Sequence, residues 1–122
     1  MPLVPQRTFT DVAVCESTTA IGSTPVAAYG TAPVAGYVQR VMAASVASTG
    51  ATVTIAVTIN GGSDIAAGAL TIASGAAAKN TVEFPLAGAS AVFVNEGDLI
   101  AFTPSGGSSA VAGAMALIIR AG

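Results

Sequence analysis

The sequence contains no histidine and no tryptophan, and it has a single cysteine. The absence of histidine removes the commonest general base, the commonest metal ligand and the usual partner of a serine or cysteine nucleophile. Cys15 has no second thiol to pair with, so we expect no internal disulfide, and we predict a small buried side chain on a strand. These absences predict a protein that is not an enzyme, with no catalytic residues, no metal site and no cofactor.

Charge is also scarce: charged residues are 8% of the chain, against about 25% in a typical globular domain. The four basic residues, at positions 7, 40, 79 and 120, are far apart in the sequence. Without a basic cluster to neutralise phosphates, we expect no nucleic-acid binding. A surface so poor in charge is weakly hydrated and does little to keep copies apart. We therefore expect much of it to contact other protein; the alternative is an uncharged monomer.

Long hydrophobic runs are missing as well. The longest apolar run covers residues 110–119 and is interrupted by Gly113, whereas a membrane-spanning helix needs about 20 residues. Residues 1–7 lack the charged start and apolar run of a secretory signal. We therefore expect neither membrane insertion nor classical secretion.

Residues 51–59 are the clearest strand that the sequence does contain. Valine and isoleucine alternate there with threonine and alanine, which places apolar side chains on one face of a strand. Most of these residues are β-branched and favour a strand over a helix. Asn60-Gly61-Gly62 follows directly and predicts a hairpin turn, and we predict a second hairpin turn at Gly106-Gly107.

The remaining pattern predicts short strands separated by turn residues. We expect them at residues 9–15, 37–46, 69–73, 81–86, 91–94, 98–102 and 111–120, with a further short strand near 26–29. Residues 104–108 should separate the last two strands, and Ala76–Asn80 is the place for one helical turn. The spacing predicts an all-β fold: a single antiparallel β-sandwich or jelly-roll of about eight short strands.

Residues 1–10 differ from the rest of the chain. Two prolines hold this segment extended and block a helix. We predict an extended N-terminal arm at 1–10 and a β-sandwich domain at 11–122. An extended arm adds contact area, or a strand, to a partner's sheet edge. The predicted partner-contact residues are Pro2, Leu3, Val4, Pro5, Arg7 and Phe9.

The turn Asn95-Glu96-Gly97-Asp98 holds two nearby carboxylates. Paired acids can perform acid–base chemistry or bind a hard cation. An acidic turn before a strand also satisfies loop backbone groups, and no EF-hand spacing accompanies this one. We therefore interpret the turn as structural.

Several turn-and-strand signatures in residues 36–121 carry a family resemblance. They are Thr58-Ile59-Asn60-Gly61-Gly62, Leu70-Thr71-Ile72, the segment from Val94 to Ile100, Ser105-Gly106-Gly107-Ser108 and the closing Leu117-Ile118-Ile119-Arg120. This arrangement resembles the small jelly-roll proteins of tailed bacteriophages, namely capsid decoration (cement) proteins and head fibres. The resemblance implies a homotrimer made in the host cytoplasm that sits on the capsid exterior at threefold or quasi-threefold positions. There it would clamp neighbouring major capsid proteins, without catalytic residues.

Two other functions remain open. A phage fibre or tail module that recognises host surface glycan would use the loops of such a sandwich, although aromatic residues are few. The second is a subunit of a non-viral assembly, because nothing in the sequence excludes such a protein.

Overall fold

A computed structural model describes residues 10–21, 25–47, 49–73, 80–86, 91–107 and 111–121. The described residues form nine strands and no helix: β1 (Thr10–Thr18), β2 (Ala28–Thr31), β3 (Gly36–Ser45), β4 (Val53–Ile59), β5 (Thr71–Ile72), β6 (Asn80–Pro85), β7 (Phe93–Val94), β8 (Leu99–Ser105) and β9 (Gly113–Ala121). Within these ranges, no helix is long and apolar enough to cross a bilayer. The expected helical turn at 76–79 lies outside the described residues, and Asn80 begins β6 instead.

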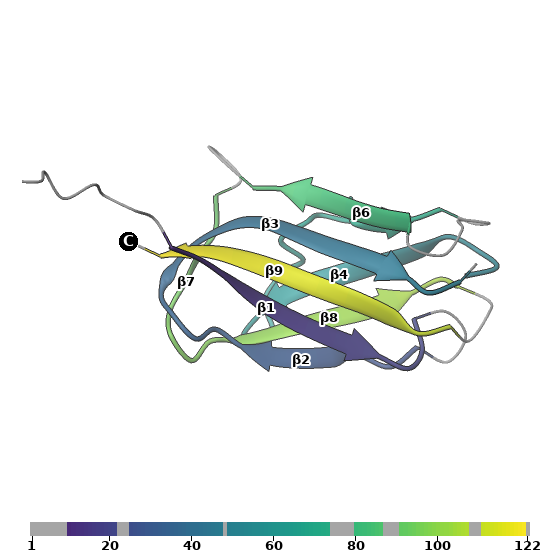
Figure 1. The fold of residues 1–122 in the computed structure, drawn as a ribbon, viewed down its shortest axis with the longest axis horizontal. Helices are drawn as coiled ribbons and strands as arrows, with labels where there is room; N and C mark the ends of the chain where they lie inside the picture. The colour runs from purple at the N-terminus through teal and green to yellow at the C-terminus, as the bar shows by residue number, and fades with distance from the viewer. Residues whose placement is uncertain are drawn as a thin grey trace, which may run out of the picture.

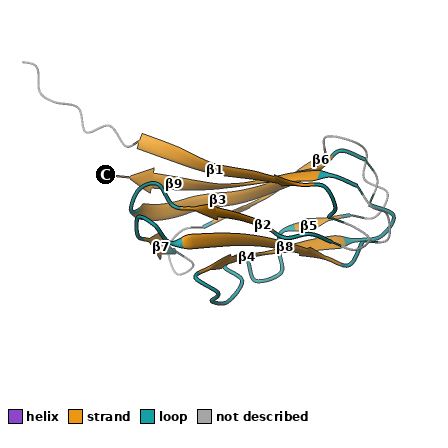
Figure 2. Ribbon diagram, turned by 90° about the horizontal axis from the view of Figure 1, so that it is seen from below, coloured by secondary structure: helices purple, strands orange, loops and turns teal. Residues whose placement is uncertain are grey.

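The strands form two antiparallel sheets packed face to face (Figure 2). The first sheet has the order β1-β9-β3-β6, with β7 pairing to β3, and the second has the order β2-β8-β4-β5. The pairings are nested: β1 with β9, β2 with β8, β3 with β6 and β7, and β4 with β5. This is the arrangement of a jelly roll, which confirms the predicted fold class. Because β6 and β7 share one edge of β3, the nine strands fill eight positions, as the strand count predicted.

The core lies between the two sheets and follows the alternation of the sequence. Val53, Ile55 and Val57 of β4 are completely buried, and the threonine and alanine residues between them face outward. Phe102 of β8 and Leu117 of β9 are also completely buried, so both sheets contribute large side chains to the core. Each such side chain contributes about 1.5–3 kcal/mol when it is removed from water.

The predicted turn after β4 is confirmed. Asn60 and Gly61 have φ values of 54° and 76°, and the Gly62 N–H donates to the Ile59 carbonyl at 3.1 Å. Asparagine and glycine are the residues that tolerate this left-handed pair of conformations. The chain then returns along β4 and pairs with it again at β5.

Two turn predictions are wrong. Strand β8 continues through Pro104, which pairs with Ile55 of β4. The Ile55 N–H points away from β8 and donates to the Leu70 carbonyl. Ile55 and Pro104 are therefore a pair that exchanges no hydrogen bonds, and the N–H that proline lacks is not needed between β4 and β8. Residues Gly106-Gly107 do not form a hairpin, because β8 and β9 belong to different sheets and the segment after β8 crosses between them.

Strand ends differ from the predicted ones by a few residues. Strand β1 runs three residues beyond the predicted end at Cys15, and the short strand near 26–29 lies at Ala28–Thr31. Only Thr71 and Ile72 of the predicted 69–73 segment pair as a strand. In the connection before it, the Asp64 carboxylate accepts hydrogen bonds from the N–H groups of Val57, Ala66 and Gly68.

Candidate protein-docking face

The outward side of the first sheet carries mostly small or apolar side chains, and we call it the outer face. Strand β1 presents its odd-numbered residues there, because Val12, Val14 and Thr18 point toward the core. The antiparallel registers continue these rows across β9, β3 and β6. Behind the terminal row, the outer-face residues are Ala13, Cys15 and Ser17 of β1, Ala114, Ala116 and Ile118 of β9, Arg40, Met42 and Ala44 of β3, and Thr81, Glu83 and Pro85 of β6.

An open groove of about 490 Å³ lies on this face. Ten residues line it: Cys15, Glu16, Ser17, Met42, Ala43, Ala44, Thr81, Ala114, Met115 and Ala116. Glu16 is the only charged residue among them, but its side chain extends from the opposite side of β1, toward Gly30 of β2, and the lining surface of the groove is mainly apolar. Small side chains over a groove let another backbone approach closely, whereas a substrate pocket needs convergent polar groups.

Cys15 is exposed on the outer face, so the prediction of a buried thiol is wrong. The even-numbered residues of β1 fill the core side, and a strand places neighbouring side chains on opposite faces. Within the described residues, no group of three or more cysteine or acidic residues lies close enough to hold a metal ion.

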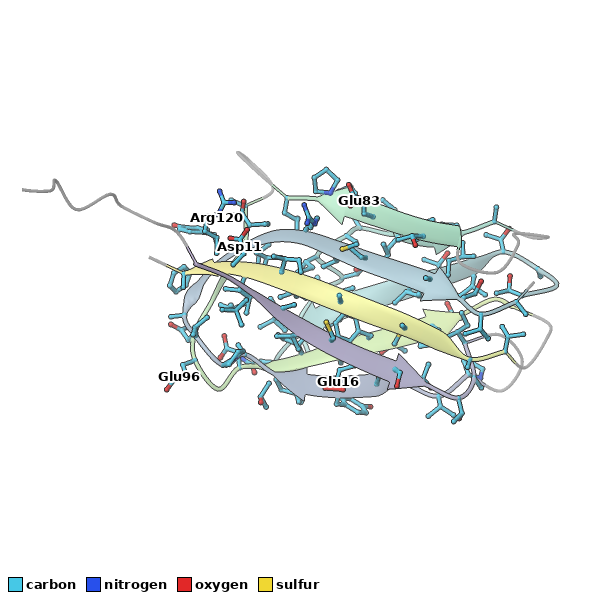
Figure 3. All side chains as sticks on the ribbon, viewed as in Figure 1. Asp11, Glu16, Glu83, Glu96 and Arg120 are labelled. Atoms are coloured by element: carbon cyan, nitrogen blue, oxygen red, sulfur yellow. The ribbon has the colours of Figure 1, made fainter. Side chains whose placement is uncertain are left out.

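A row of four side chains crosses the first sheet where β1 begins and β9 ends, and we call it the terminal row: Asp11, Arg120, Tyr37 and Phe93. The Arg120 guanidinium donates two hydrogen bonds to the Asp11 carboxylate, at 2.9 and 3.2 Å (Figure 3). These bonds hold the pKa of Asp11 below its ordinary value of 3.8 and raise the pKa of Arg120. The ring of Tyr37 meets that of Phe93 edge to face, with centroids 5.1 Å apart.

The outer face carries a second pair of opposite charges at its other border. Arg40 of β3 and Glu83 of β6 approach to 4.0 Å and are both about half exposed. An exposed pair at this distance contributes little stability. The charges of the outer face therefore occur as opposite-sign pairs, and no single-sign field extends over it.

In the acidic turn at residues 95–98, one carboxylate satisfies donors of the surrounding turns. The Asp98 carboxylate accepts hydrogen bonds from the Asn60 side-chain amide at 3.0 Å and from the Asn95 N–H at 2.8 Å. These bonds, that from Asn95 first, hold the pKa of Asp98 below 3.8. Gly97 takes a φ of 87°, and the Glu96 side chain extends from the turn away from the sheets (Figure 3).

The outward side of the second sheet is different in character. Its side chains are largely hydroxyl-bearing: Thr54 and Thr58 of β4, Thr103 and Ser105 of β8, Thr31 of β2 and Thr71 of β5. Tyr29 and Leu99 are the large apolar side chains that it exposes. The groove described above lies on the first sheet, so we take the outer face as the candidate docking face.

The six predicted partner-contact residues of the arm, Pro2, Leu3, Val4, Pro5, Arg7 and Phe9, lie outside the described residues. The described chain begins at Thr10, which pairs with Ala121 in the strand register. Sequence reasoning did not identify the outer face or the terminal row. The alternation of small residues at 13, 15, 17, 114 and 116 was the available signal, but the sequence does not say which side of these strands faces the core.

Comparison with known proteins adds little to this description. No protein-family model and no curated protein matches the chain. A solved structure with a coarse resemblance in fold is the cryo-EM structure of the giant freshwater prawn Macrobrachium rosenbergii extra small virus (XSV) VLP. It shares 12% sequence identity with a TM-score of 0.39, over 98% of this chain and 87% of that one.

Proposed function

We propose that this chain is a structural virion protein that decorates a phage capsid and stabilises it by clamping neighbouring major capsid proteins. The observation that carries the proposal is the outer face: small, apolar side chains surround an open groove, and its charges are paired. Such a face loses little hydration when another protein covers it. The protein's contribution on this account is contact area, with no chemical step.

The size of the face supports a combined contact with the arm. Four strands about 4.8 Å apart and about 30 Å long give a face of roughly 600 Å². A standard stable interface buries about 800 Å² on each partner. The outer face alone falls short of that area, so the proposed contact also needs the arm residues at positions 2–5, 7 and 9.

Repetition would compensate for a modest contact. A decoration protein that binds as a closed oligomer, a homotrimer on this proposal, joins several shell subunits at once. Once one protomer is bound, the others bind at a high effective concentration. Individually weak contacts then suffice to hold the protein on the capsid exterior.

Heat disruption of shells tests this function. Shells that lack the protein should fall apart at a lower temperature than native shells, and adding the purified protein should restore the difference. A control is the same protein unfolded and alkylated at Cys15, which should restore nothing. Equal heat resistance of bare and decorated shells would contradict the proposal.

A further inference from the structure

Of the strands that the structure describes, four border the two sheets, and three of these are poorly suited to pair with a further strand. The borders are β1 and β6 in the first sheet (Figure 1) and β2 and β5 in the second. Strands β2 and β5 are only four and two residues long. Strand β6 ends at Pro85, which has no N–H to donate, and carries the charged Glu83. Short, charged or proline-containing borders are the usual protection of a sheet against pairing with other strands.

Strand β1 lacks this protection. It is nine residues long, it pairs with β9 without a shift in register, and it contains no proline, glycine, lysine or arginine. Among the described strands its one partner is β9, so its other edge carries a row of backbone N–H and C=O groups that face away from the sheet.

The two carboxylates of β1 leave this edge open. Asp11 is on the outer face and pairs with Arg120. Glu16 extends beneath the strand, where its Oε1 atom lies 2.9 Å from the position that a Cβ on Gly30 of β2 would occupy. Side chains of a strand stand above and below the sheet, so neither carboxylate blocks the backbone groups along the edge.

The sequence of β1 is compatible with pairing to a second copy of itself. In an antiparallel pair about a two-fold axis normal to the sheet, both copies keep their odd-numbered side chains on the outer face. Odd residues therefore lie opposite odd residues, and even residues opposite even ones. Full overlap of Thr10–Thr18 places Val14 opposite Val14 of the second copy at the axis.

The other pairs in this register are also compatible. On the outer face, Ala13 lies opposite Cys15 of the second copy, and Asp11 lies opposite Ser17. On the core side, Glu16 lies opposite Val12. No like charges are opposite one another, whereas a strand with a central charge would repel its own copy at the axis.

The edge supplies enough hydrogen bonds for a stable contact. Two nine-residue strands in antiparallel pairing exchange about eight to ten backbone hydrogen bonds. A typical protein interface has about ten direct hydrogen bonds in all. Pairing would also place the outer faces of the two copies side by side as one continuous surface.

We infer that the free edge of β1 is a self-association site, at which a second copy of this chain adds its own β1 in antiparallel orientation. The two first sheets then form one continuous sheet. This inference goes beyond the proposed function and does not require it. Where the chain forms the proposed homotrimer, the two-fold contact joins protomers of different trimers.

Sedimentation of the full-length protein over a concentration series tests the inference. The wild type should reach a mass of an even number of protomers. The variant Ala13→Lys/Cys15→Lys should have half that mass, because it sets lysines opposite lysines across the axis. The matched control, Ala114→Lys/Thr81→Lys, adds the same charge to the outer face away from this edge and should keep the wild-type mass.

Oxidative cross-linking gives a second readout that does not depend on weakening the contact. Ala13→Cys brings a thiol opposite Cys15 of the second copy, with Cβ atoms about 5 Å apart, close to the distance in a disulfide. Mild oxidation should give a covalent dimer. Ala44→Cys, on β3 of the same face, is the control and should stay uncross-linked.

Several outcomes would overturn the inference. They are an odd number of protomers at every concentration, an edge variant that keeps the wild-type mass, and cross-linking of Ala13→Cys no greater than that of the control. A wild type that does not self-associate, with an edge variant that loses binding to shells, would assign the edge to a strand of the shell protein. That result would overturn self-association and leave the proposed function standing.

Discussion

At the scale of single residues, the few carboxylates of this chain are used to satisfy backbone and side-chain donors. Asp64 accepts from the N–H groups of Val57, Ala66 and Gly68, and Asp98 holds the turn before β8. Asp11 pairs with Arg120. In a protein with so little charge, these groups are structural parts of the fold.

Replacing Asp64 with alanine should destabilise the fold by about 1–3 kcal/mol, because it leaves backbone donors without a partner. The Val57 and Ala66 donors belong to completely buried residues, and the hydrogen bonds are 2.8–3.0 Å long. Asp64→Asn keeps one acceptor oxygen and should lose less. Urea unfolding measures both values, and an alanine variant as stable as the wild type would show that this turn does not depend on the carboxylate.

Stability should fall at acidic pH because of Asp98. Hydrogen bonds from Asn95 and Asn60 lower its pKa in the folded protein below 3.8. A lowered pKa gives stability that is fully present above the unfolded-state pKa of about 4 and is lost as the pH falls through the folded-state value. The difference in unfolding free energy between the wild type and Asp98→Asn, measured with urea, should thus shrink as the pH falls below about 5. A difference in unfolding free energy that stays constant down to about pH 2, where carboxyl groups are protonated, would contradict this role of Asp98.

At the scale of elements, the sequence predicted where the strands lie, but not how they pair or which of their faces is buried. The alternation of β4 and the Asn60-Gly61 turn are local properties, and both are confirmed. The continuation of β8 through Pro104 was not predicted. Whether a proline interrupts a strand depends on whether its backbone nitrogen faces the partner strand, and the sequence does not show this. The exposure of Cys15 was missed for a similar reason: alternation fixes two faces, and only the packed sheet decides which one is buried.

Replacing Gly36 with alanine should separate β3 from β9. An added Cβ would overlap the Arg120 carbonyl oxygen and come 2.8 Å from its carbon. Overpacking of this kind costs about 1–3 kcal/mol. The control is Gly62→Ala, whose Cβ would meet only the Ile59 carbonyl oxygen at 3.2 Å. Thermal unfolding should rank Gly36→Ala well below Gly62→Ala, and the reverse order would contradict the close packing of β3 on β9.

The boundary between arm and domain can be tested by truncation. Removing residues 1–9 should leave the unfolding free energy within about 0.5 kcal/mol of the wild type, because the buried core residues of the described part of the chain run from Val14 to Ile119. Removing residues 1–18 should abolish cooperative unfolding, because it deletes β1 and exposes the edge of β9. Unfolding of the shorter truncation would show that the arm belongs to the folded domain.

At the scale of the whole molecule, nested pairing brings the first and last strands together. Strand β1 pairs with β9 over its full length, so the start of β1 at Thr10 lies beside the terminal row and the outer face (Figure 1). Sequence reasoning predicted the sandwich, but not that its first and last strands are neighbours. That relation depends on pairing between residues about 110 positions apart, such as Asp11 and Arg120, which no local pattern encodes.

The most direct test of the proposed function is saturation binding of the labelled, full-length protein to bare capsids and, in parallel, to the unassembled major capsid protein. A protein that clamps neighbouring subunits should bind assembled shells saturably, at a fixed ratio to the major capsid protein, and should bind the separated subunits far more weakly. Absence of saturable binding to shells, or equal affinity for shells and free subunits, would contradict the account.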